Sequence, residues 1–292
     1  MSCDRPHTSP PKQTAALYVV GTPIGNLEDI TLRAVRVLKE VELIACEDTR
    51  QTQKLLHHYD IRKPMVSYHE HNEMTRAAEL IVELENGRSI ALVTDAGTPA
   101  ISDPGCRLIS LAIRHRIPVV PVPGASAFLA ALVASGLPSD SFRFSGFLPA
   151  RRGERQEALK RVKDSPRTQI FYEAPHRIRE ALADVVEVLG PARHVVIARE
   201  VTKIHEEFLR GRAADLLEQV QTQGELKGEI TLLIGKAEEH AGAEEASPQK
   251  IRHRLREVMA RDHLDQMAAL KVVAKEFGIS KSAAYRELQR AK

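Results

Sequence analysis

The sequence has 292 residues, more than a typical domain of roughly 100 to 200, so we expect two domains or one domain with an appendage. Apolar residues make up 43% and charged residues 28%, which is ordinary for a globular protein and excludes wholesale disorder, collagen-like chains and coiled coils. The three cysteines lie far apart without a Cys-x-x-Cys pair. This excludes a disulfide framework or a zinc site built from them and favours a reducing, cytoplasmic compartment.

The N-terminal segment 1–14 holds charges and three prolines in place of an apolar stretch, so we interpret it as a disordered tail and not as a secretory signal. The longest apolar run, at 128–137, is shorter than the roughly 20 residues that cross a bilayer. We therefore predict no membrane association.

The next part of the chain alternates between strand-like and helix-like patterns. Apolar, β-rich runs predict strands at 15–20, 42–46, 65–68, 89–95 and 118–122. Segments of helical period lie between them, from about Thr31, at 77–86, at 107–116 and after Ser126. This βαβ pattern predicts an N-terminal α/β lobe over 15–140 with a mostly parallel sheet.

A second α/β series follows over 141–236. It has predicted strands at 143–147, 168–173, 194–200, 206–211 and 229–235, and helices from Arg155, Pro175 and Ala213. Residues 237–249 are Ala, Glu, Gly, Ser and Pro without periodicity, which is typical of a linker. A separate helical module is predicted over 250–292.

That last module has the spacing of a helix-turn-helix. Ala274 permits close helix crossing, Gly278 and Ile279 occupy the turn, Ser280 caps the next helix, and Ala284 completes the pattern. Residues 248–292 carry 11 basic and 5 acidic side chains, a net +6, and 143–167 carry 8 and 3, a net +5. Two basic stretches favour a polyanionic partner. The alternatives are solvated faces and a bundle that only packs on a partner protein.

Three loops at predicted strand ends are candidate ligand-binding loops. They are GTPIGNLEDITLRA at 21–34, TDAGTPAISDPG at 94–105 and VPGASAF at 122–128, in which Gly124 would allow close backbone approach. The first loop matches neither the dinucleotide fingerprint nor a Walker A loop, which weakens NAD and ATP as ligands. The other two loops contain no lysine, so their ligand need not be an anion. Tight turns with a purely structural role are the alternative.

Four polar clusters could contact a substrate. Glu47, Asp48 and Arg50 follow a strand, but a helix cap with surface charges has the same composition. His69 and His71 lie on one face of an extended segment, and no third ligand is visible, so we predict no metal site. Later strands end in Glu173 with His176 and Arg177, and in Glu200 with Lys203; structural ion pairs would look the same.

Together the motifs GTPIGNLEDITLRA, EDTRQT, YHEHNE, DAGTPAISDPG, GFLPAR, FYEAPHR, ARE-x-TK and KGE resemble the ribosomal RNA small subunit methyltransferase I family, within the tetrapyrrole methylase superfamily. The resemblance covers Leu17 to Gly235 and a C-terminal helical module. It implies a two-lobed α/β class III methyltransferase fold, a homodimer, and S-adenosylmethionine bound between the lobes. The implied reaction is 2′-O-methylation of a P-site cytidine in the 16S rRNA of the assembled small ribosomal subunit.

The resemblance also implies roles for individual residues. The implied cofactor-binding residues are Pro23, Ile24, Asp95, Gly97, Thr98, Ile101, Ser126, Ala127, Tyr172, Ala174, Gly228 and Ile230. The expected substrate-binding residues are Glu47, Asp48, Arg50, His71, Asn72, His176 and Arg177. As groups that could accept the hydroxyl proton we expect Glu200 and Lys203 first and then Glu173, with Glu47 and His71 also eligible.

Two other functions remain open from the sequence. A small-molecule methyltransferase acting on tetrapyrroles would share the fold and the cofactor loops, but would not need the basic stretches or the terminal module. A ligand-sensing helix-turn-helix regulator would explain the C-terminus but would leave the polar clusters without a role. The chain has no Trp and only 12 Phe or Tyr, so extensive base stacking along RNA is not expected.

Overall fold

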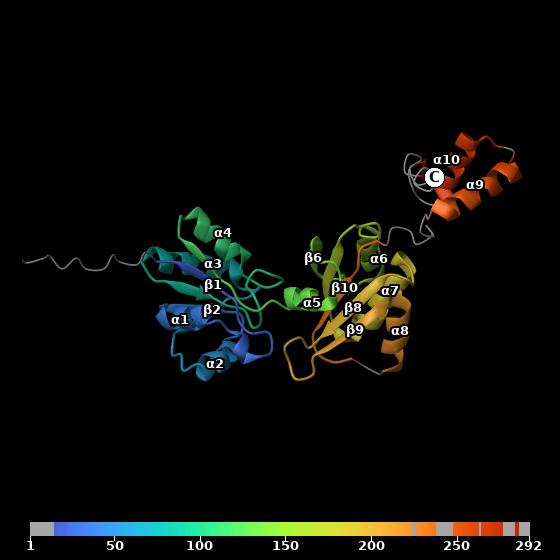
Figure 1. Ribbon diagram of the computed structural model, residues 1–292. Helices are drawn as coiled ribbons and strands as arrows, with labels where there is room; N and C mark the ends of the chain where they lie inside the picture. The colour runs from blue at the N-terminus through green and yellow to red at the C-terminus, as the bar shows by residue number, and fades with distance from the viewer. Residues whose placement is uncertain (1–14, 224–225, 238–247, 263, 277–283, 286–292) are drawn as a thin grey trace, which may run out of the picture. The chain divides into compact units, whose positions relative to one another are not determined.

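The computed structural model describes residues 15–223, 226–237, 248–262, 264–276 and 284–285 (Figure 1). The chain divides into two compact units, 1–236 and 237–292. The predicted tail, 1–14, and most of the predicted linker lie outside the described residues. The boundary between the two predicted lobes at 140/141 stays a prediction. No described helix is both long enough and apolar enough to span a membrane.

The first sheet is entirely parallel and has the strand order β3-β2-β4-β1-β5. Its strands are β1 (Leu17–Val20), β2 (Leu43–Cys46), β3 (Met65–Ser67), β4 (Ile90–Leu92) and β5 (Val119–Val122). All five coincide with predicted strands. Helices cover both faces, as such sheets require. They are α1 (Leu32–Glu40), α2 (Thr49–His58), α3 (Glu73–Glu85) and α4 (Cys106–Arg114), with a 3-10 turn, η1 (Leu27–Asp29), before α1.

Two separate cores hold these helices on the sheet. Val37 and Leu38 of α1 and Leu56 of α2 pack with Ile44 and Val93 on one face. On the opposite face a second cluster joins α3 and α4 to the sheet, including Leu80, Leu84, Leu92 and Leu108. Figure 1 shows the two helix pairs on opposite sides of the strands. Because all strands run the same way, the loops after β1, β2, β4 and β5 meet at one edge.

The second sheet is mixed and has the order β6-β7-β10-β8-β9, with only β6 and β7 parallel. Its strands are β6 (Phe142–Phe147), β7 (Thr168–Glu173), β8 (His194–Arg199), β9 (Glu207–Arg212) and β10 (Ile230–Ile234). One face carries α6 (Arg152–Lys160), α7 (Ile178–Leu189) and α8 (Ala213–Thr222), packed over a large apolar core; η2 (Pro175–Arg177) leads into α7.

The opposite face of the second sheet is covered by α5 (Ala127–Ser135), which the sequence analysis assigns to the first lobe. Ala131 and Leu132 pack against Ile170, Val196 and Leu233. The helix reads AFLAALVAS and is apolar all round, so its periodicity could not indicate which sheet it would cover. Gly136, with φ of 79°, ends the helix in a left-handed conformation.

The second unit contains α9 (Pro248–Asp262) and α10 (Gln266–Glu276). Leu255, Val258, Leu270 and Val273 form a core of their own, to which Ala274 and Ala284 also belong. Gly278, Ile279 and Ser280 lie outside the described residues, so the helix-turn-helix stays a prediction. Part of the local basic charge is paired, since Arg254 contacts Glu257 and Glu276.

Candidate active site

A cavity of about 340 Å³ lies where the strand-end loops of the first sheet face the second sheet. We call it the donor cavity. The loops after β1, β2, β4 and β5 and residues of the second sheet contribute its lining: Ile24, Glu47, Asp95, Ala96, Gly97, Thr98, Ile101, Asp103, Ser126, Ala127, Phe147, Tyr172, Val201, Glu229 and Thr231. Ligands bind at this edge in open α/β sheets because the loops converge there.

Backbone and side-chain hydrogen bonds hold these loops together. Thr22 and Gly97 exchange two backbone hydrogen bonds of 2.8 and 3.1 Å, and the Thr22 hydroxyl donates to the carbonyl of Thr94 at 3.1 Å. The backbone N–H of Asp48 donates to the Asp95 carboxylate at 3.0 Å. The loops after β1, β2 and β4 therefore form one connected wall.

Gly21 and Gly124 bring the loops after β1 and β5 into direct contact. A Cβ on Gly21 would lie 2.8 Å from the Cα of Gly124, a distance that real Cβ atoms do not show. The expected close backbone approach at Gly124 is confirmed, and the approaching segment is the loop after β1. Periodicity and spacing could not show this contact, because the two glycines are far apart in the sequence.

The structure brings together most of the residues that the resemblance assigns to the cofactor. Those lining the donor cavity are Ile24, Asp95, Gly97, Thr98, Ile101, Ser126, Ala127 and Tyr172. Pro23 lines an adjoining cavity. Ala174 is the N-cap residue before η2, Gly228 packs against the Glu200 side chain, and Ile230 is buried in the core of the second sheet. These last three do not line the donor cavity.

Other lining residues were not singled out by the sequence analysis: Ala96, Asp103, Phe147, Val201, Glu229 and Thr231. Asp103 belongs to the loop at 94–105, which the sequence analysis predicts to bind a ligand. An aspartate beside proline and glycine is, however, equally typical of a turn without a functional role. Phe147 ends the edge strand β6 and is 57% exposed. An exposed aromatic side chain beside a cavity is a clearer indication of a binding role. Its exposure and the cavity can be seen only in the structure.

Carboxylates dominate the polar lining of the donor cavity. Burial, followed by the charges of Glu47 and Asp95, raises the pKa of Asp103 to about 7. Burial, followed by the charge of Asp95, also raises the pKa of Glu47. Among the described lining residues there is no lysine or arginine. The cavity is therefore suited to a cationic ligand and not to a phosphate.

Asp48 and Arg50 match the structural alternative. The Asp48 side chain accepts a hydrogen bond of 2.8 Å from the backbone N–H of Arg50 and so caps α2. The Arg50 guanidinium donates two hydrogen bonds back to the same carboxylate, at 3.1 and 2.7 Å. These contacts lower the pKa of Asp48 to about 2. Of this cluster, Glu47 is the member that lines the donor cavity.

The segment around His69 is a turn and not the extended run expected from the sequence. The Asn72 side chain accepts from the backbone N–H of His69 at 2.9 Å and donates to the carbonyl of Ser67 at 3.1 Å, so its amide fixes this turn. His71 is exposed, with its ring 6.0 Å from that of His69. Among the described residues, no group of three or more His, Cys, Asp or Glu side chains is placed so that it could hold a metal ion.

Glu173 and Arg177 form a buried ion pair of 2.6 Å, with the Glu173 side chain fully buried. Burial raises the pKa of Glu173 although Arg177 opposes the shift. His176 is exposed beside them. None of the three lines the donor cavity.

Glu200 and Lys203 also form an ion pair, of 2.8 Å, and Lys203 contacts Glu229 at 3.3 Å. Burial alone would lower the pKa of Lys203, but the hydrogen bond to Glu200 and the charge of Glu229 outweigh it and raise the pKa. A lysine that accepts a proton must first be neutral, so this environment disfavours that role.

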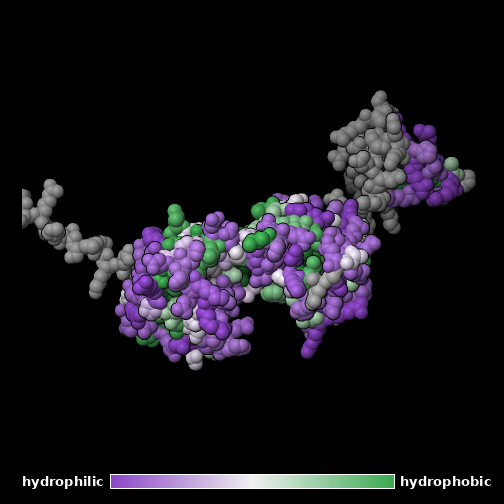
Figure 2. All heavy atoms as spheres, turned by 90° about the horizontal axis from the view of Figure 1, so that it is seen from below, coloured by the Kyte–Doolittle hydropathy of each residue, from purple (hydrophilic) through white to green (hydrophobic). Residues whose placement is uncertain are grey.

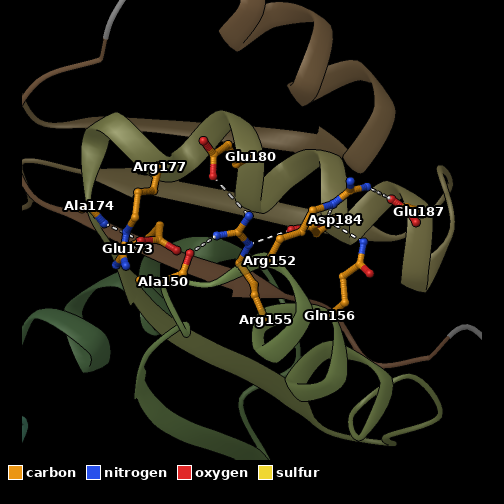
Figure 3. A network of polar contacts seen from close by, with 10 residues as sticks. All are labelled: Ala150, Arg152, Arg155, Gln156, Glu173, Ala174, Arg177, Glu180, Asp184 and Glu187. Atoms are coloured by element: carbon orange, nitrogen blue, oxygen red, sulfur yellow. Dashed lines mark hydrogen bonds and ion pairs between the residues drawn. The ribbon is translucent and has the colours of Figure 1, made fainter.

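The basic stretch at 143–167 is partly neutralised by a network between α6 and α7 (Figure 3). Arg155 is 1% exposed and donates to Asp184 at 2.7 Å. Arg152 contacts both Asp184 and Glu187. Burial alone would raise the pKa of Asp184, but hydrogen bonds from Arg155, Gln156 and Arg152 lower it. Part of this stretch therefore stabilises the fold.

Comparison with known proteins identifies the family. The model for tetrapyrrole (corrin/porphyrin) methylases matches residues 16–217. A protein of Escherichia coli O157:H7 named ribosomal RNA small subunit methyltransferase I is 44% identical over 281 residues, which cover 96% of each chain. The chain belongs to this family. A namesake from Halalkalibacterium halodurans is 54% identical over 218 residues, 75% of each chain.

Solved structures of tetrapyrrole methylases share the fold. The uroporphyrin-III C-methyltransferase of Thermus thermophilus, complexed with S-adenosylhomocysteine, has a TM-score of 0.54 and 19% identity over 76% of this chain and 98% of that one. Cobalt precorrin-4 methyltransferase has a TM-score of 0.59 and 17% identity over 78% and 97%. At these identities the likeness concerns the fold.

The donor cavity fits the cofactor that the family implies. S-adenosylmethionine carries a positive sulfonium and an ammonium group, and Asp95 and Glu47 supply negative charge. Ile24, Ile101 and Tyr172 add apolar and aromatic surface for a flat base.

Proposed function

We propose that this family member uses S-adenosylmethionine to methylate the ribose 2′-oxygen of a P-site cytidine in 16S rRNA, acting on the assembled small ribosomal subunit. The observation that carries the proposal is the donor cavity, which lies at the strand-end loops of a methylase fold. Carboxylates line it, and its described lining residues include no lysine or arginine. The proposed substrate is a cytoplasmic particle, so we propose a cytoplasmic location.

The chain's own residues would hold the cofactor and align the acceptor. Ile24, Gly97, Thr98, Ser126 and Ala127 bring backbone groups and small side chains to the cavity, as expected for close ligand contact. When bound, the cofactor supplies an electrophilic methyl group. The loops hold their places before binding, because they are already cross-linked by hydrogen bonds, and this preorganisation favours alignment.

Contacts with RNA would come from the exposed basic side chains that the network between α6 and α7 leaves available. Arg143, Arg161, Lys163 and Arg167 are exposed, and the described residues give none of them a salt bridge. Basic groups of this kind bind phosphates, so we expect binding to weaken steeply as salt rises. The relatives' names support RNA over a tetrapyrrole as the acceptor.

We also propose that the protein is a homodimer. The visible face of the described residues is mostly hydrophilic, with a few hydrophobic groups (Figure 2). On α5, Leu129 and Val133 are 44% and 77% exposed, although the helix has no polar face. Phe142, 38% exposed, lies on the edge strand β6. A second copy covering these side chains would give twice the mass of 32.4 kDa, and Val133→Glu would restore the monomer mass in light scattering.

The test of function is transfer of labelled methyl from S-adenosylmethionine to small subunits that lack the modification. Naked 16S rRNA, duplex DNA and a tetrapyrrole precursor serve as parallel acceptors. We expect label in the subunits, mapped to a cytidine ribose. Label in the tetrapyrrole alone would contradict the RNA substrate, and label in none of them would contradict the methyltransferase assignment.

A further inference from the structure

A second cavity adjoins the donor cavity. It has a volume of about 570 Å³ and is lined by residues of the loop after β4 and the start of α4, with Glu70, Glu73, Glu47 and Phe147. Glu47, Asp103 and Phe147 line both cavities. A ligand in one cavity would therefore meet a ligand in the other at these three side chains.

The loop that carries Asp103 has a constrained shape. Ala100 and Ser102 have φ of 67° and 62°, a left-handed conformation that non-glycine residues rarely adopt. The N–H of Ala100 donates to the carbonyl of Pro104 at 3.3 Å, which closes the loop on itself. Gly105 packs against Leu92 and Ala100. Strain of this kind is concentrated at functional sites, where the surrounding fold maintains it.

The chemistry of the second cavity matches a nucleoside and not a phosphate. The described lining of this cavity contains four carboxylates and one basic side chain, Arg107. The carboxylates are Glu47, Glu70, Glu73 and Asp103. Carboxylates accept hydrogen bonds from ribose hydroxyls and from the exocyclic amine of cytosine, but repel phosphates. The phosphates of a bound nucleotide would have to stay outside.

Phe147 supplies the surface on which a base could lie. Its side chain is 57% exposed, and its ring meets Tyr172 edge-on with centroids 5.6 Å apart. An aromatic face next to hydrogen-bond acceptors is the arrangement by which proteins hold single unstacked bases. A single base at this position is compatible with the low aromatic content of the chain.

We propose that the second cavity, here called the acceptor cavity, receives the ribose and base of the target nucleotide, and that Asp103 accepts the 2′-hydroxyl proton. This inference rests on the proposed function. The 2′-oxygen forms its bond to the methyl carbon as the carbon–sulfur bond of the donor breaks. The sulfur keeps that electron pair, and the hydroxyl proton moves to the Asp103 carboxylate.

The electrostatic surroundings support Asp103 over the other carboxylates. It has a pKa of about 7, near which a general base is most effective, because burial and the charges of Glu47 and Asp95 disfavour its ionised form. The Thr94 hydroxyl opposes this rise. The other charged groups of the two cavities are Glu70, Glu73, Arg107 and Glu229.

The test compares Asp103→Asn with a control variant, Glu154→Gln. Glu154 is an exposed carboxylate on α6 that lines neither cavity. Single-turnover methyl transfer to small subunits should fall at least about 100-fold in Asp103→Asn, while S-adenosylmethionine binding measured by calorimetry is retained. Glu154→Gln should match the wild type. Asp103→Asn within threefold of the wild-type rate would overturn the role of Asp103.

Phe147 provides an independent test of the acceptor cavity. Phe147→Ala should raise the KM for small subunits about tenfold or more through lost stacking, and Phe147→Tyr should restore it. An unchanged KM in Phe147→Ala would contradict this position of the base. A wild-type protein that transfers no methyl to subunits would instead contradict the proposed function, so the two failures are distinguishable.

Discussion

Asp184 and Asp103 are both carboxylates shielded from solvent, but their surroundings shift their pKa values in opposite directions. Asp184 lies between α6 and α7, where Arg155, Arg152 and Gln156 donate hydrogen bonds to it and lower its pKa. Asp103 lies beside other carboxylates, and its burial, followed by the charges of Glu47 and Asp95, raises its pKa to about 7. Compensated charge stabilises the fold, whereas uncompensated charge costs stability and is typical of functional sites.

The largest expected effect on stability comes from removing Asp184, the carboxylate whose charge is compensated by arginines. Asp184→Ala leaves the guanidinium of Arg155, 1% exposed, without its main acceptor, and should destabilise the fold by about 3 kcal/mol near pH 7. Because the pKa of Asp184 is lowered in the folded state, its contribution is lost as the pH falls through that pKa. Urea unfolding between pH 3 and 8 measures both.

The matched control for Asp184 is Glu187→Gln. Glu187 is 56% exposed and contacts the exposed Arg152, so its loss should change stability by less than about 0.5 kcal/mol. Equal losses in Asp184→Ala and Glu187→Gln would show that the network does not depend on the buried pair.

An intermediate effect is expected where the loops meet. Gly124→Ala places a Cβ about 2.8 Å from the backbone of Gly21, so it should cost about 2 kcal/mol of unfolding free energy and weaken S-adenosylmethionine binding. Gly153→Ala on α6 has no atom within 4 Å of the new Cβ and should be neutral or slightly stabilising. Unfolding and calorimetric binding of both variants test the claim; normal binding in Gly124→Ala would contradict it.

A smaller effect of opposite sign is expected at Asp103. Between the ordinary carboxyl range and pH 7 the folded protein holds a proton that the unfolded chain releases, so wild-type stability falls as the pH rises through this window. Asp103→Asn removes that dependence and should stabilise the fold by about 1 kcal/mol at pH 8, with no gain at pH 3. Destabilisation at pH 8 would argue that the carboxylate is compensated.

Local patterns predict the strands of the two sheets, because apolar runs between turn residues depend only on neighbouring positions. They do not predict α2, which the sequence analysis leaves out, nor the sheet that α5 covers, since that helix is apolar all round. Motifs identify the loops of the donor cavity. The role of Asp103 depends on its distance from Glu47 and Asp95 in space, and the partner of Gly124 is equally non-local, so neither could be seen in the sequence.

The most direct test of the account is the pH dependence of methyl transfer to small subunits, measured at limiting S-adenosylmethionine and subunits in the wild type and in Glu47→Gln. Under these conditions the profile reports the free enzyme. We predict a wild-type rate that rises with pH and reaches half its maximum near pH 7, and a midpoint that moves to lower pH in Glu47→Gln because a neighbouring negative charge is removed. A flat profile, or an unmoved midpoint in Glu47→Gln, would contradict the claim that uncompensated carboxylates form the reaction centre.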